Sequence, residues 1–477
     1  MNINPPFDEA GKTYQQTHMK HWDKVAQKRD HWSGLGRWYH QRLTEIYRYL
    51  INPGQRILEI GCGAGNLLAQ LKPAYGVGVD FSPEMVERAK QQHPEFEYHQ
   101  IDAHDLSALE GEFDIIILSD TVNDLWDVQR AFEQLRRFCS PHTRVIINFY
   151  SHVWQAPLTL AQSLNLASPM LPQNWLTRDD IDNMLHLAGF EGIRFSQEIL
   201  WPLPLGGFAN RYLARLWPFY GFTLSNFMVA RPAPQASNEP SVSVVIAARN
   251  EAGNIKSIFE RVPKMGSRTE IVFVEGHSRD NTYETIADEI PLHPLTPSLL
   301  LRQPGIGKAD AIRAGFDRAS GDILMILDAD LTVPPEDLPR FYDAIVSGKG
   351  EFINGVRLIY PMEKEAMQTL NFIGNKLFSM AFSWLLGQPI KDTLCGTKVM
   401  WRKDYEQIAA NRSYFGDFDP FGDFDLIFGA AKLNRKIIDM PIRYRDRTYG
   451  TTNISRWKHG LLLFRMVAFA ARRIKFV

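Results

Sequence analysis

Two aspartates in the second half of the chain could hold a metal ion. The stretch ILMILDADLTVPPED places Asp328 and Asp330 at the end of an apolar run that predicts a buried strand. Residues i and i+2 of an extended chain project to the same side, so both carboxylates should share one face. Two close carboxylates repel each other, and a hard divalent cation such as Mg²⁺ or Mn²⁺ relieves this repulsion. Since Mg²⁺ usually binds phosphates alongside one or two carboxylates, a diphosphate group is the expected partner.

A glycine-rich turn in the first half could bind a nucleotide. Gly61, Gly63 and Gly65 stand between a short apolar strand and a helical pattern, where the absence of a Cβ atom lets the backbone approach a ligand. The next strand ends in Asp80, whose carboxylate can accept hydrogen bonds from both hydroxyls of a ribose. The dinucleotide fingerprint GxGxxG would need a glycine at position 66, where this chain has Asn66. The turn therefore indicates a nucleotide-type site that departs from the dinucleotide fingerprint.

The elements that must position these residues alternate between short apolar strands and longer helical patterns. This alternation occurs twice, before and after a stretch rich in Pro, Ala and Ser at residues 230–241. Such alternation predicts parallel sheets covered by helices, and 477 residues exceed one ordinary core. We therefore predict an α/β protein of two domains, at residues 1–232 and 241–477, joined by a linker at 233–240.

Composition and charge restrict the class of protein. The net charge of −1 gives no indication of a nucleic-acid partner, and no apolar run is long enough for a transmembrane helix. Cys62, Cys139 and Cys395 are far apart, which predicts neither disulfides nor a zinc site and suits a reducing cytosol. Residues 443–477 hold nine Lys or Arg against one acid. This asymmetry indicates an anionic surface or ligand near the C-terminus.

The first half resembles the class I S-adenosylmethionine-dependent methyltransferases over about residues 40–232. The pattern E-x-G-x-G-x-G at residues 59–65, the acid after the second strand, Asp102 in YHQIDAHDL, and the strands FDIIILSD, TRVIINFYS and NFMVARP carry the resemblance. It implies a Rossmann-like fold and S-adenosylmethionine as the cofactor. The residues implied to bind the cofactor are Glu59, Gly61, Gly63, Gly65, Asp80, Asp102 and Asp120.

Candidates for the methyl acceptor's side follow the fourth and fifth strands. Such an enzyme mainly positions a nucleophile in line with the methyl group. Asp120 and Asn123 should face that group, one of them as base or orienter, and Tyr150 and His152 are weaker candidates. Cys62 needs no chemistry, so we expect it to be a small apolar filler.

The second half resembles the family 2 glycosyltransferases with the GT-A fold over about residues 240–460. The motifs AARNEAGN, EGHSRDNT, GKADAIRAG and DADL occur in that order, and DTLCGTKVM and RDRTYGTTNISRWKHG resemble the polyprenyl-phosphate (dolichyl-phosphate) glucosyl- and mannosyltransferases within the family. An aspartate pair alone is more typical of a capped turn, but these ordered motifs favour a metal site held by Asp328 and Asp330. The residues implied to bind the nucleotide-sugar are Ala248, Arg249, Asn250, Glu251, Glu275, Asp280, Lys308, Asp328, Ala329, Asp330, Asp392, Gly396 and Lys398. The residues implied to grip the acceptor's phosphate are Arg447, Tyr449 and Gly450.

Three positions depart from that family's usual pattern. Glu275 stands where an aspartate is usual, Thr332 stands where the mannosyl enzymes often carry glutamine, and Thr397 replaces an aromatic residue. The segment DTLCGTK is closer to the glucosyl branch. A UDP-sugar is therefore the favoured donor, with GDP-mannose as the alternative.

The catalytic candidates of this half are Asp423, Asp425 and Arg447. Both aspartates precede an apolar helix, where inverting members that glycosylate a hydroxyl place their base. A phosphate acceptor is already anionic at neutral pH and needs no strong base. Helix capping is the alternative role for these acids.

Three further segments could contact apolar ligands or a membrane. Helical spacing of apolar residues predicts interface helices at 370–387, with Ile373, Leu377, Met380 and Trp384, and at 458–477, with Leu463, Val467, Ala470 and Ile474. The alternative is that these faces pack on the protein core. The variable segment 154–217 is rich in Leu, Pro and aromatic residues, and is either a lid over an apolar acceptor or a loop packed on its own core.

These observations predict a bifunctional enzyme attached peripherally to the cytoplasmic face of a membrane. It would transfer a sugar to a polyprenyl-phosphate-type lipid and a methyl group to another acceptor. One alternative is a hydroxyl acceptor for the sugar. The other is a first domain that binds S-adenosylmethionine, or acts as a scaffold, without catalysis.

Overall fold

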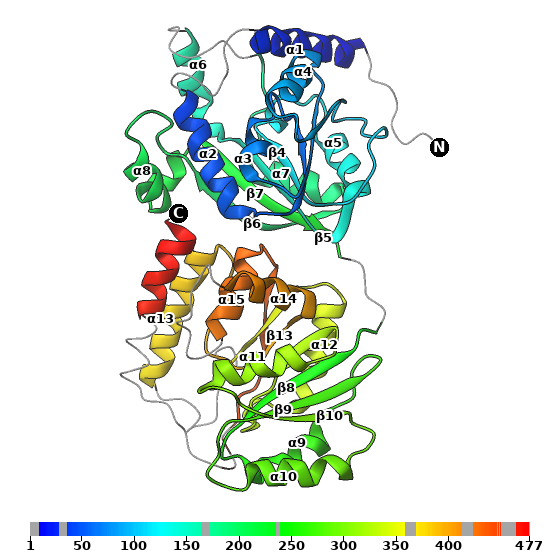
Figure 1. The fold of residues 1–477 in the computed structure, drawn as a ribbon. Helices are drawn as coiled ribbons and strands as arrows, with labels where there is room; N and C mark the ends of the chain where they lie inside the picture. Colours follow the sequence, from blue (N-terminus) through cyan, green and yellow to red (C-terminus); the bar gives the residue numbers. More distant parts are fainter. Residues whose placement is uncertain are drawn as a thin grey trace. The chain divides into compact units, whose positions relative to one another are not determined.

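The structure, a computed structural model, describes residues 9–27, 36–163, 171–234, 239–357, 369–412, 423–445, 447, 449 and 464–476, without the side chains of 161–163, 369–375 and 423. The chain divides into two compact units. Unit 1 comprises Met1–Ala233 with Phe476–Val477, and unit 2 comprises Pro234–Lys475. Both units are α/β, which confirms the predicted fold class (Figure 1).

A seven-stranded sheet forms the centre of unit 1, in the order β3-β2-β1-β4-β5-β7-β6. Its strands are β1 Arg56–Ile60, β2 Tyr75–Asp80, β3 Glu97–Gln100, β4 Phe113–Ser119, β5 Cys139–Tyr150, β6 Phe190–Glu198 and β7 Ser225–Pro232. Strand β7 runs antiparallel to β5 and β6, and the other neighbouring pairs are parallel. The strand order reverses at β1 and β4, and ligands of open α/β sheets bind at the carboxyl ends of such strands.

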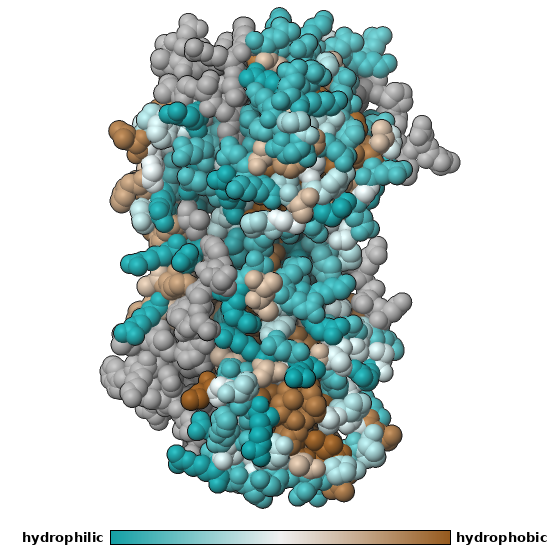
Figure 2. All heavy atoms as spheres, viewed as in Figure 1, coloured by the Kyte–Doolittle hydropathy of each residue, from teal (hydrophilic) through white to brown (hydrophobic). Residues whose placement is uncertain are grey.

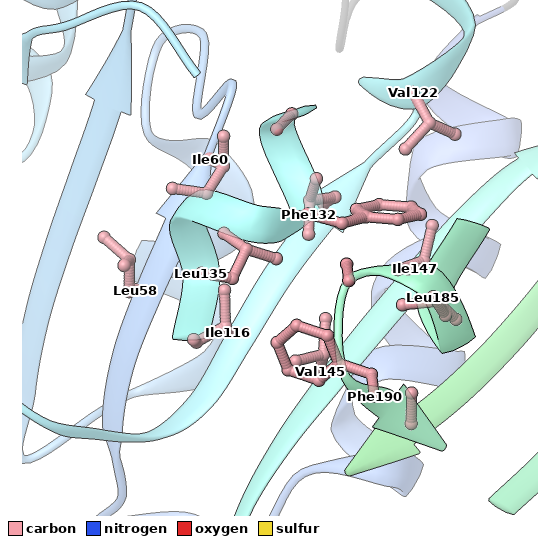
Figure 3. Close-up of a cluster of buried hydrophobic side chains, with 14 of the residues drawn as sticks. Leu58, Ile60, Ile116, Val122, Phe132, Leu135, Val145, Ile147, Leu185 and Phe190 are labelled. Carbon is pink, nitrogen blue, oxygen red and sulfur yellow. The ribbon is translucent and has the colours of Figure 1, made fainter. Parts of the chain in front are cut away.

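Helices cover both faces of this sheet because its strands are apolar on both sides. One face carries α5 (Val128–Leu135) and α7 (Arg178–Leu187), and the other carries α2 (Gly36–Leu50), α3 (Asn66–Leu71) and α4 (Pro83–Gln92). Successive residues of β1 point to opposite faces, so Leu58 packs with α5 while Ile57 packs with α2. Figure 3 shows Leu135 of α5 beside Ile116 in the first of these two cores.

A second seven-stranded sheet forms the centre of unit 2, in the order β10-β9-β8-β11-β13-β12-β14. Its strands are β8 Val242–Ala248, β9 Thr269–Glu275, β10 Ser298–Arg302, β11 Ile323–Ile326, β12 Phe352–Val356, β13 Lys398–Trp401 and β14 Ile437–Pro441. Strand β13 is antiparallel to β11 and β12. The strand order reverses at β8 and β11, whose carboxyl ends receive both predicted donor-binding motifs.

The helices of unit 2 also lie on both faces. They are α9 Ile255–Arg261, α10 Thr282–Glu289, α11 Lys308–Arg318, α12 Leu338–Val346, α13 Thr369–Leu386, α14 Arg402–Ala410 and α15 Asp423–Lys432. Helices α9, α10 and α12 share one core with the sheet, whereas α11 packs through Gly315 against Val245 and Val274. Within the described residues, no helix is long and apolar enough to cross a membrane.

The extended-chain prediction for Asp328 and Asp330 is wrong in its local geometry. Strand β11 ends at Ile326, two residues before the first aspartate. The amide of Leu331 donates to the carbonyl of Asp328 at 3.2 Å, which closes a turn around the pair. The turn, not the pleat of a strand, therefore sets the directions of these carboxylates.

Candidate active sites

In unit 1, the predicted glycines form a tight turn at the carboxyl end of β1. The φ angles are +70° at Gly61 and +51° at Gly63, in the left-handed region that favours glycine. A Cβ at Gly61 would collide with Thr121, whereas a Cβ at Gly63 would meet no atom within 4 Å. The amide of Gly63 donates to Asp80 Oδ2 at 2.9 Å, and Gly65 precedes α3. The turn is thus open at Gly63 and anchored to the carboxylate that ends β2.

Two buried carboxylates support this turn. Glu59 Oε2 accepts a hydrogen bond from the amide of Leu68 at 3.2 Å, at the start of α3. Burial raises the pKa of Glu59 to about 8 and the pKa of Asp80 to about 6. Glu59 therefore fixes the helix that follows the turn, while Asp80 fixes the turn itself.

Helix α1 (Glu9–Gln27) reaches the residues that follow β2 and β3. Gln15 donates to Asp102, and Asp23 accepts a hydrogen bond from the Ser82 hydroxyl at 2.6 Å. Asp102 also accepts from the amide of His104 at 2.8 Å and from its ring Nδ1 at 2.5 Å. Burial alone would raise the pKa of Asp102, but the hydrogen bonds and charge of His104 lower it. No motif in the sequence indicated that α1 reaches these residues.

A polar network surrounds Asp120 at the carboxyl end of β4. The Tyr39 hydroxyl donates to this carboxylate, at 2.8 Å and 3.0 Å from its two oxygens, and Asn148 Nδ2 donates at 2.5 Å. The Tyr39 oxygen lies 3.1 Å from Ser225 Oγ, and the Tyr47 hydroxyl donates to Asn148 Oδ1 at 2.7 Å. Burial raises the pKa of Asp120 to about 7, although the hydrogen bonds of Tyr39 and Asn148 oppose the rise. A carboxylate with this pKa can exchange a proton near neutral pH.

The other acceptor-side candidates divide into two groups. Tyr150 lies beside the network, with its ring centroid 6.3 Å from that of Tyr39. Asn123 is fully buried, donates to the carbonyl of Asn174 at 2.7 Å and accepts from the amide of Tyr150 at 3.2 Å. Its amide therefore has a structural role, and His152 is exposed in the short helix after β5.

The cysteines have no partner in a disulfide. Cys62, Cys139 and Cys395 are free thiols, and Cys62 packs in the core beside α2 and α3. Burial raises the pKa of the Cys62 thiol well above its ordinary value. These observations agree with the interpretation of Cys62 as an apolar filler.

In unit 2, each aspartate of the predicted metal site faces a cation. Lys308 Nζ, at the first residue of α11, lies 2.5 Å from Asp328 Oδ1. Arg447 Nη2 lies 2.5 Å from Asp330 Oδ2, and its Nη1 lies 3.5 Å from Glu251 Oε1. Burial would raise the pKa of Asp328, but the attraction of Lys308 outweighs it and lowers the pKa. The Asp328 carboxylate can therefore stay charged when no metal is bound.

The predicted nucleoside residues lie at the ends of β8 and β9 and in the loops that follow. Ala248 ends β8 and is followed by Arg249, Asn250 and Glu251, whereas Glu275 ends β9 and Asp280 lies in the loop after it. Glu275 Oε1 accepts from the amide of Ser278 at 2.5 Å, and Asp280 Oδ1 accepts from the amide of Thr282 at 3.1 Å. Both acids shape their own loop, and the longer glutamate still reaches a loop amide where the family usually has aspartate.

Gly396 lies directly against the aspartate pair. A Cβ at this position would overlap the Asp328 carboxylate and approach Lys308 Nζ to 2.5 Å. Only a residue without a side chain leaves room for this carboxylate and this ammonium group together. Within the segment DTLCGTK, position 396 therefore requires glycine, because a side chain there would have no space.

Asp392 and Lys398 are the first and last residues of that segment and hold its two ends in place. Asp392 is fully buried and accepts two hydrogen bonds from the side chain of Arg357, at 2.7 Å and 2.9 Å. Burial would raise the pKa of Asp392, but the charge of Arg357 lowers it. Lys398 is also fully buried and donates to Asn354 Oδ1 at 3.0 Å. The sequence predicted that both residues lie near the sugar but missed Arg357. The position of this arginine at the end of β12 could have indicated it.

The base candidate Asp425 is buried between two arginines. Arg313 Nη2 lies 3.2 Å from Asp425 Oδ2, and Arg412 Nε lies 3.0 Å from the same oxygen. Both guanidinium groups thus face the same oxygen of this carboxylate, which is the arrangement of a structural ion pair. Asp423 begins α15, and its side chain lies outside the described residues.

The predicted acceptor-phosphate residues approach the loop after β8. The ring of Tyr449 occupies the space where a Cβ of Gly253 would lie, while Arg447 reaches Glu251. Gly450 lies outside the described residues. Thr332, which stands where the mannosyl enzymes often carry glutamine, donates to Asp330 Oδ1 at 2.7 Å. Thr397, at the third departure from the family pattern, is fully buried.

The two predicted interface helices differ in what they expose. Leu377, Met380 and Trp384 of α13 form an exposed stripe, as the helical spacing predicted. In the last helix, exposure of the predicted apolar face is wrong for Ala470 and Ile474, which are buried, and Leu463 lies outside the described residues. That stripe packs on the protein, which was the alternative interpretation. The helix instead exposes Phe464 and the basic residues Arg465, Arg472 and Arg473.

Comparisons with known proteins match the two units separately. Residues 57–142 match the model of a methyltransferase domain, and residues 243–409 match the model of glycosyl transferase family 2. The second unit is similar to the dolichol-phosphate mannosyltransferase of Pyrococcus furiosus, with 36% identity over 22% of this chain and 30% of the relative. It is also similar to the undecaprenyl-phosphate 4-deoxy-4-formamido-L-arabinose transferase of Pectobacterium atrosepticum, with 36% identity over 45% of this chain and 63% of the relative. The chain therefore spans less than two thirds of either relative.

Among solved structures, the first unit is similar to an S-adenosylmethionine-dependent methyltransferase from Mesorhizobium loti. The identity is 21%, the coverage is 39% of this chain and 96% of that chain, and the TM-score is 0.32. The two family models thus match a methyltransferase domain in the first unit and a family 2 glycosyltransferase domain in the second, as the sequence predicted.

Proposed function

We propose that this two-domain enzyme transfers a sugar from a nucleotide-sugar to the phosphate of a polyprenyl-type lipid at a membrane surface. The observation that carries the proposal is the pair of aspartates in one turn, each matched by a cation from a different segment. The relatives named above are called transferases of dolichol phosphate and undecaprenyl phosphate. A UDP-sugar is the favoured donor and GDP-mannose the alternative.

The aspartate pair would hold Mg²⁺ or Mn²⁺ together with the donor's diphosphate. The donor set fits such an ion, because Asp328 and Asp330 offer hard oxygen ligands in one turn. Among the described residues, no group of three or more potential ligand side chains gathers, so phosphate oxygens and waters would complete the coordination. The metal would neutralise charge on the leaving diphosphate. Lys308, at the start of α11, would turn from Asp328 to the diphosphate, where the helix N-terminus also favours an anion.

A phosphate acceptor is favoured over a hydroxyl acceptor by the environment of Asp425. An oxygen of a lipid phosphate is already anionic and can attack the sugar without a strong base. Asp425 is ion-paired with Arg313 and Arg412, which suits a structural role better than that of a base. Arg447 and Tyr449 would grip the acceptor's phosphate, since Arg447 extends its guanidinium group to the aspartate turn.

Attachment to the membrane would use the exposed stripe of α13. Leu377, Met380 and Trp384 are exposed at helical spacing, and Lys475 Nζ lies 5.1 Å from the centroid of the Trp384 ring. An apolar stripe bordered by basic residues suits a helix in the membrane interface. Anionic lipids would add about 1 kcal/mol of attraction for each nearby Lys or Arg. The chain would lie peripherally on the cytoplasmic face of the membrane.

The test combines the purified full chain with Mg²⁺, a set of UDP- and GDP-sugars, and undecaprenyl phosphate, with products identified by mass spectrometry. A polyprenyl phosphate sugar should form from one donor, and undecaprenol without phosphate should not react. Asp328→Asn should abolish the product. If no donor yields a glycolipid, the lipid-phosphate proposal is wrong.

For unit 1, we infer transfer of a methyl group from S-adenosylmethionine to a nucleophile held beside Asp120. This carboxylate would accept the acceptor's proton, since its pKa of about 7 keeps a useful fraction ionised at neutral pH. Tyr39 and Asn148 would orient it. Calorimetry with S-adenosylmethionine, followed by an assay of methyl release with the glycolipid product and related glycans, separates an enzyme from a binding module. Cofactor binding without turnover for any acceptor would favour the non-catalytic alternative.

A further inference from the structure

Unit 1 carries a group of exposed apolar side chains that neither proposed site uses. They lie in residues 201–222, between β6 and β7, which include α8 (Gly207–Arg211). We call these residues the aromatic patch. Leu205 is 97% exposed, Trp217 is 80% exposed and Phe222 is 58% exposed. In Figure 2, brown hydrophobic atoms protrude at the left edge, where Figure 1 labels α8.

A neighbouring segment extends this surface. Trp154 Nε1 donates to the carbonyl of Phe222 at 2.8 Å, which ties the start of α6 (Gln155–Ser163) to the patch. Val153 in this segment is also exposed. Neither residues 152–163 nor residues 201–222 contain an Asp or a Glu. The combined surface is therefore apolar and without acidic groups.

Two properties of this surface match a lipid bilayer. Trp and Tyr are the residue types enriched where proteins meet the membrane interface. The indole N–H groups of Trp154 and Trp201 already donate to carbonyls, of Phe222 and Pro204, so their rings can leave water without losing a hydrogen bond.

We propose that the aromatic patch docks unit 1 on a lipid bilayer. The charged residues of segment 201–222 are Arg211 and Arg215, so the charge of the patch favours a surface of anionic lipid. The patch ends three residues before Ser225, whose Oγ lies 3.1 Å from the hydroxyl of Tyr39, the partner of Asp120. Docking would therefore hold a membrane-borne methyl acceptor close to Asp120. This inference concerns unit 1 and does not rest on the proposed transfer of sugar.

The test measures binding of the full chain to vesicles of phosphatidylcholine and phosphatidylglycerol. Trp217→Ser combined with Phe222→Ser should lower the partition constant by at least about tenfold, since two apolar side chains no longer enter the interface. The matched control is Leu295→Ser combined with Leu187→Ser, because these leucines are exposed to the same 80% and 58% outside the patch. The control should bind vesicles like the unchanged chain. Equal binding by the patch variant and the control would overturn the proposal.

A second experiment separates the patch from α13 and from protein partners. An environment-sensitive fluorophore on Trp217→Cys should shift to the blue on vesicle binding and be quenched by brominated lipids, while the same probe on Leu295→Cys should not. Leu377→Ser with Trp384→Ser should lower vesicle binding independently of the aromatic patch. If this α13 variant binds vesicles like the unchanged chain, the result counts against the membrane role of α13 and leaves the role of the patch as it is. If the patch variant instead dissociates an oligomer, seen by light scattering, and leaves vesicle binding unchanged, the patch is a protein interface and the proposal is wrong.

Discussion

The role of Asp425 distinguishes a phosphate acceptor from a hydroxyl acceptor. The test variant is Asp425→Asn, which removes the negative charge between Arg313 and Arg412 but keeps the shape of the side chain. The Asp425 side chain is 5% exposed, while Arg313 is 23% exposed and Arg412 is 25% exposed. We expect a stable fold with a lowered melting temperature and nearly normal sugar transfer.

The magnitude follows from this partial burial. Breaking a fully buried ion pair costs about 3–5 kcal/mol. Since both arginines keep access to water, which screens their charges, the expected loss is smaller, about 1–3 kcal/mol. For a domain of this size, each kcal/mol lowers the melting temperature by roughly 2–4 °C. A general base, by contrast, contributes about 10²–10⁴-fold to the rate.

The assay compares kcat for lipid-phosphate glycosylation with the melting temperature of the same preparation. Asp425→Asn should lower kcat by less than about tenfold, below the range for a lost base. The control is Arg313→Gln with Asp425→Asn, which also removes one of the two guanidinium groups that faced the lost charge and should recover part of the stability. A loss of kcat above about 100-fold in folded protein, with loss of the acidic limb of the pH profile, would refute a structural role.

Three other predictions test the sites directly. Gly396→Ala should lower sugar transfer by at least about 100-fold, because its Cβ would overlap the Asp328 carboxylate, whereas Gly207→Ala has open space and should be neutral. Chelation with EDTA should abolish sugar transfer and added Mg²⁺ should restore it; full activity in EDTA would contradict the metal proposal. Without cofactor, the melting temperature of unit 1 should fall as pH rises from about 5 to 8, because burial raises the pKa of Asp80 to about 6 and of Glu59 to about 8, so the folded state binds these protons more tightly than the unfolded state. Scanning calorimetry checks this slope, and a constant melting temperature across that range would contradict it.

The sequence predicted the elements whose signals are local. Strand β1 was predicted at Arg56–Ile60 and forms there, since its apolar run and the glycines after it need no distant partner. The stripe of α13 was predicted for the same reason, because helical spacing alone decides which residues share a face. The family resemblance supplied the order of the remaining motifs.

Contacts between distant segments could not be predicted in this way. Tyr39 precedes Asp120 by 81 residues, and no motif marks it as the hydroxyl that donates to this carboxylate. Arg357 neutralises Asp392 across 35 residues. The turn at Asp328 was missed because a hydrogen bond from Leu331 ends the strand earlier than its apolar run suggests. Each of these missed features involves a hydrogen bond or an ion pair, and the hydrophobic pattern carries no information about polar partners.

The two sites differ in the groups that face their carboxylates, and the difference matches the charge of each proposed ligand. In unit 1, Glu59 and Asp80 accept hydrogen bonds from uncharged backbone amides, and burial raises their pKa. In unit 2, Asp328 and Asp330 face Lys308 and Arg447. Buried carboxylates with raised pKa gain from a cationic ligand, such as the sulfonium of S-adenosylmethionine, so that ligand should bind less tightly as pH falls first through about 8 and then through about 6.

Carboxylates already matched by cations gain nothing from a further cation alone. They gain when an anion draws the lysine and the arginine away, because the metal then takes the place of both. Unit 2 should therefore bind its metal weakly without the nucleotide-sugar and tightly with it, whereas unit 1 should bind its cofactor without help from a second ion. Calorimetric titration of Mg²⁺ with and without a nucleoside diphosphate measures this coupling, and equal affinities in the two titrations would contradict it.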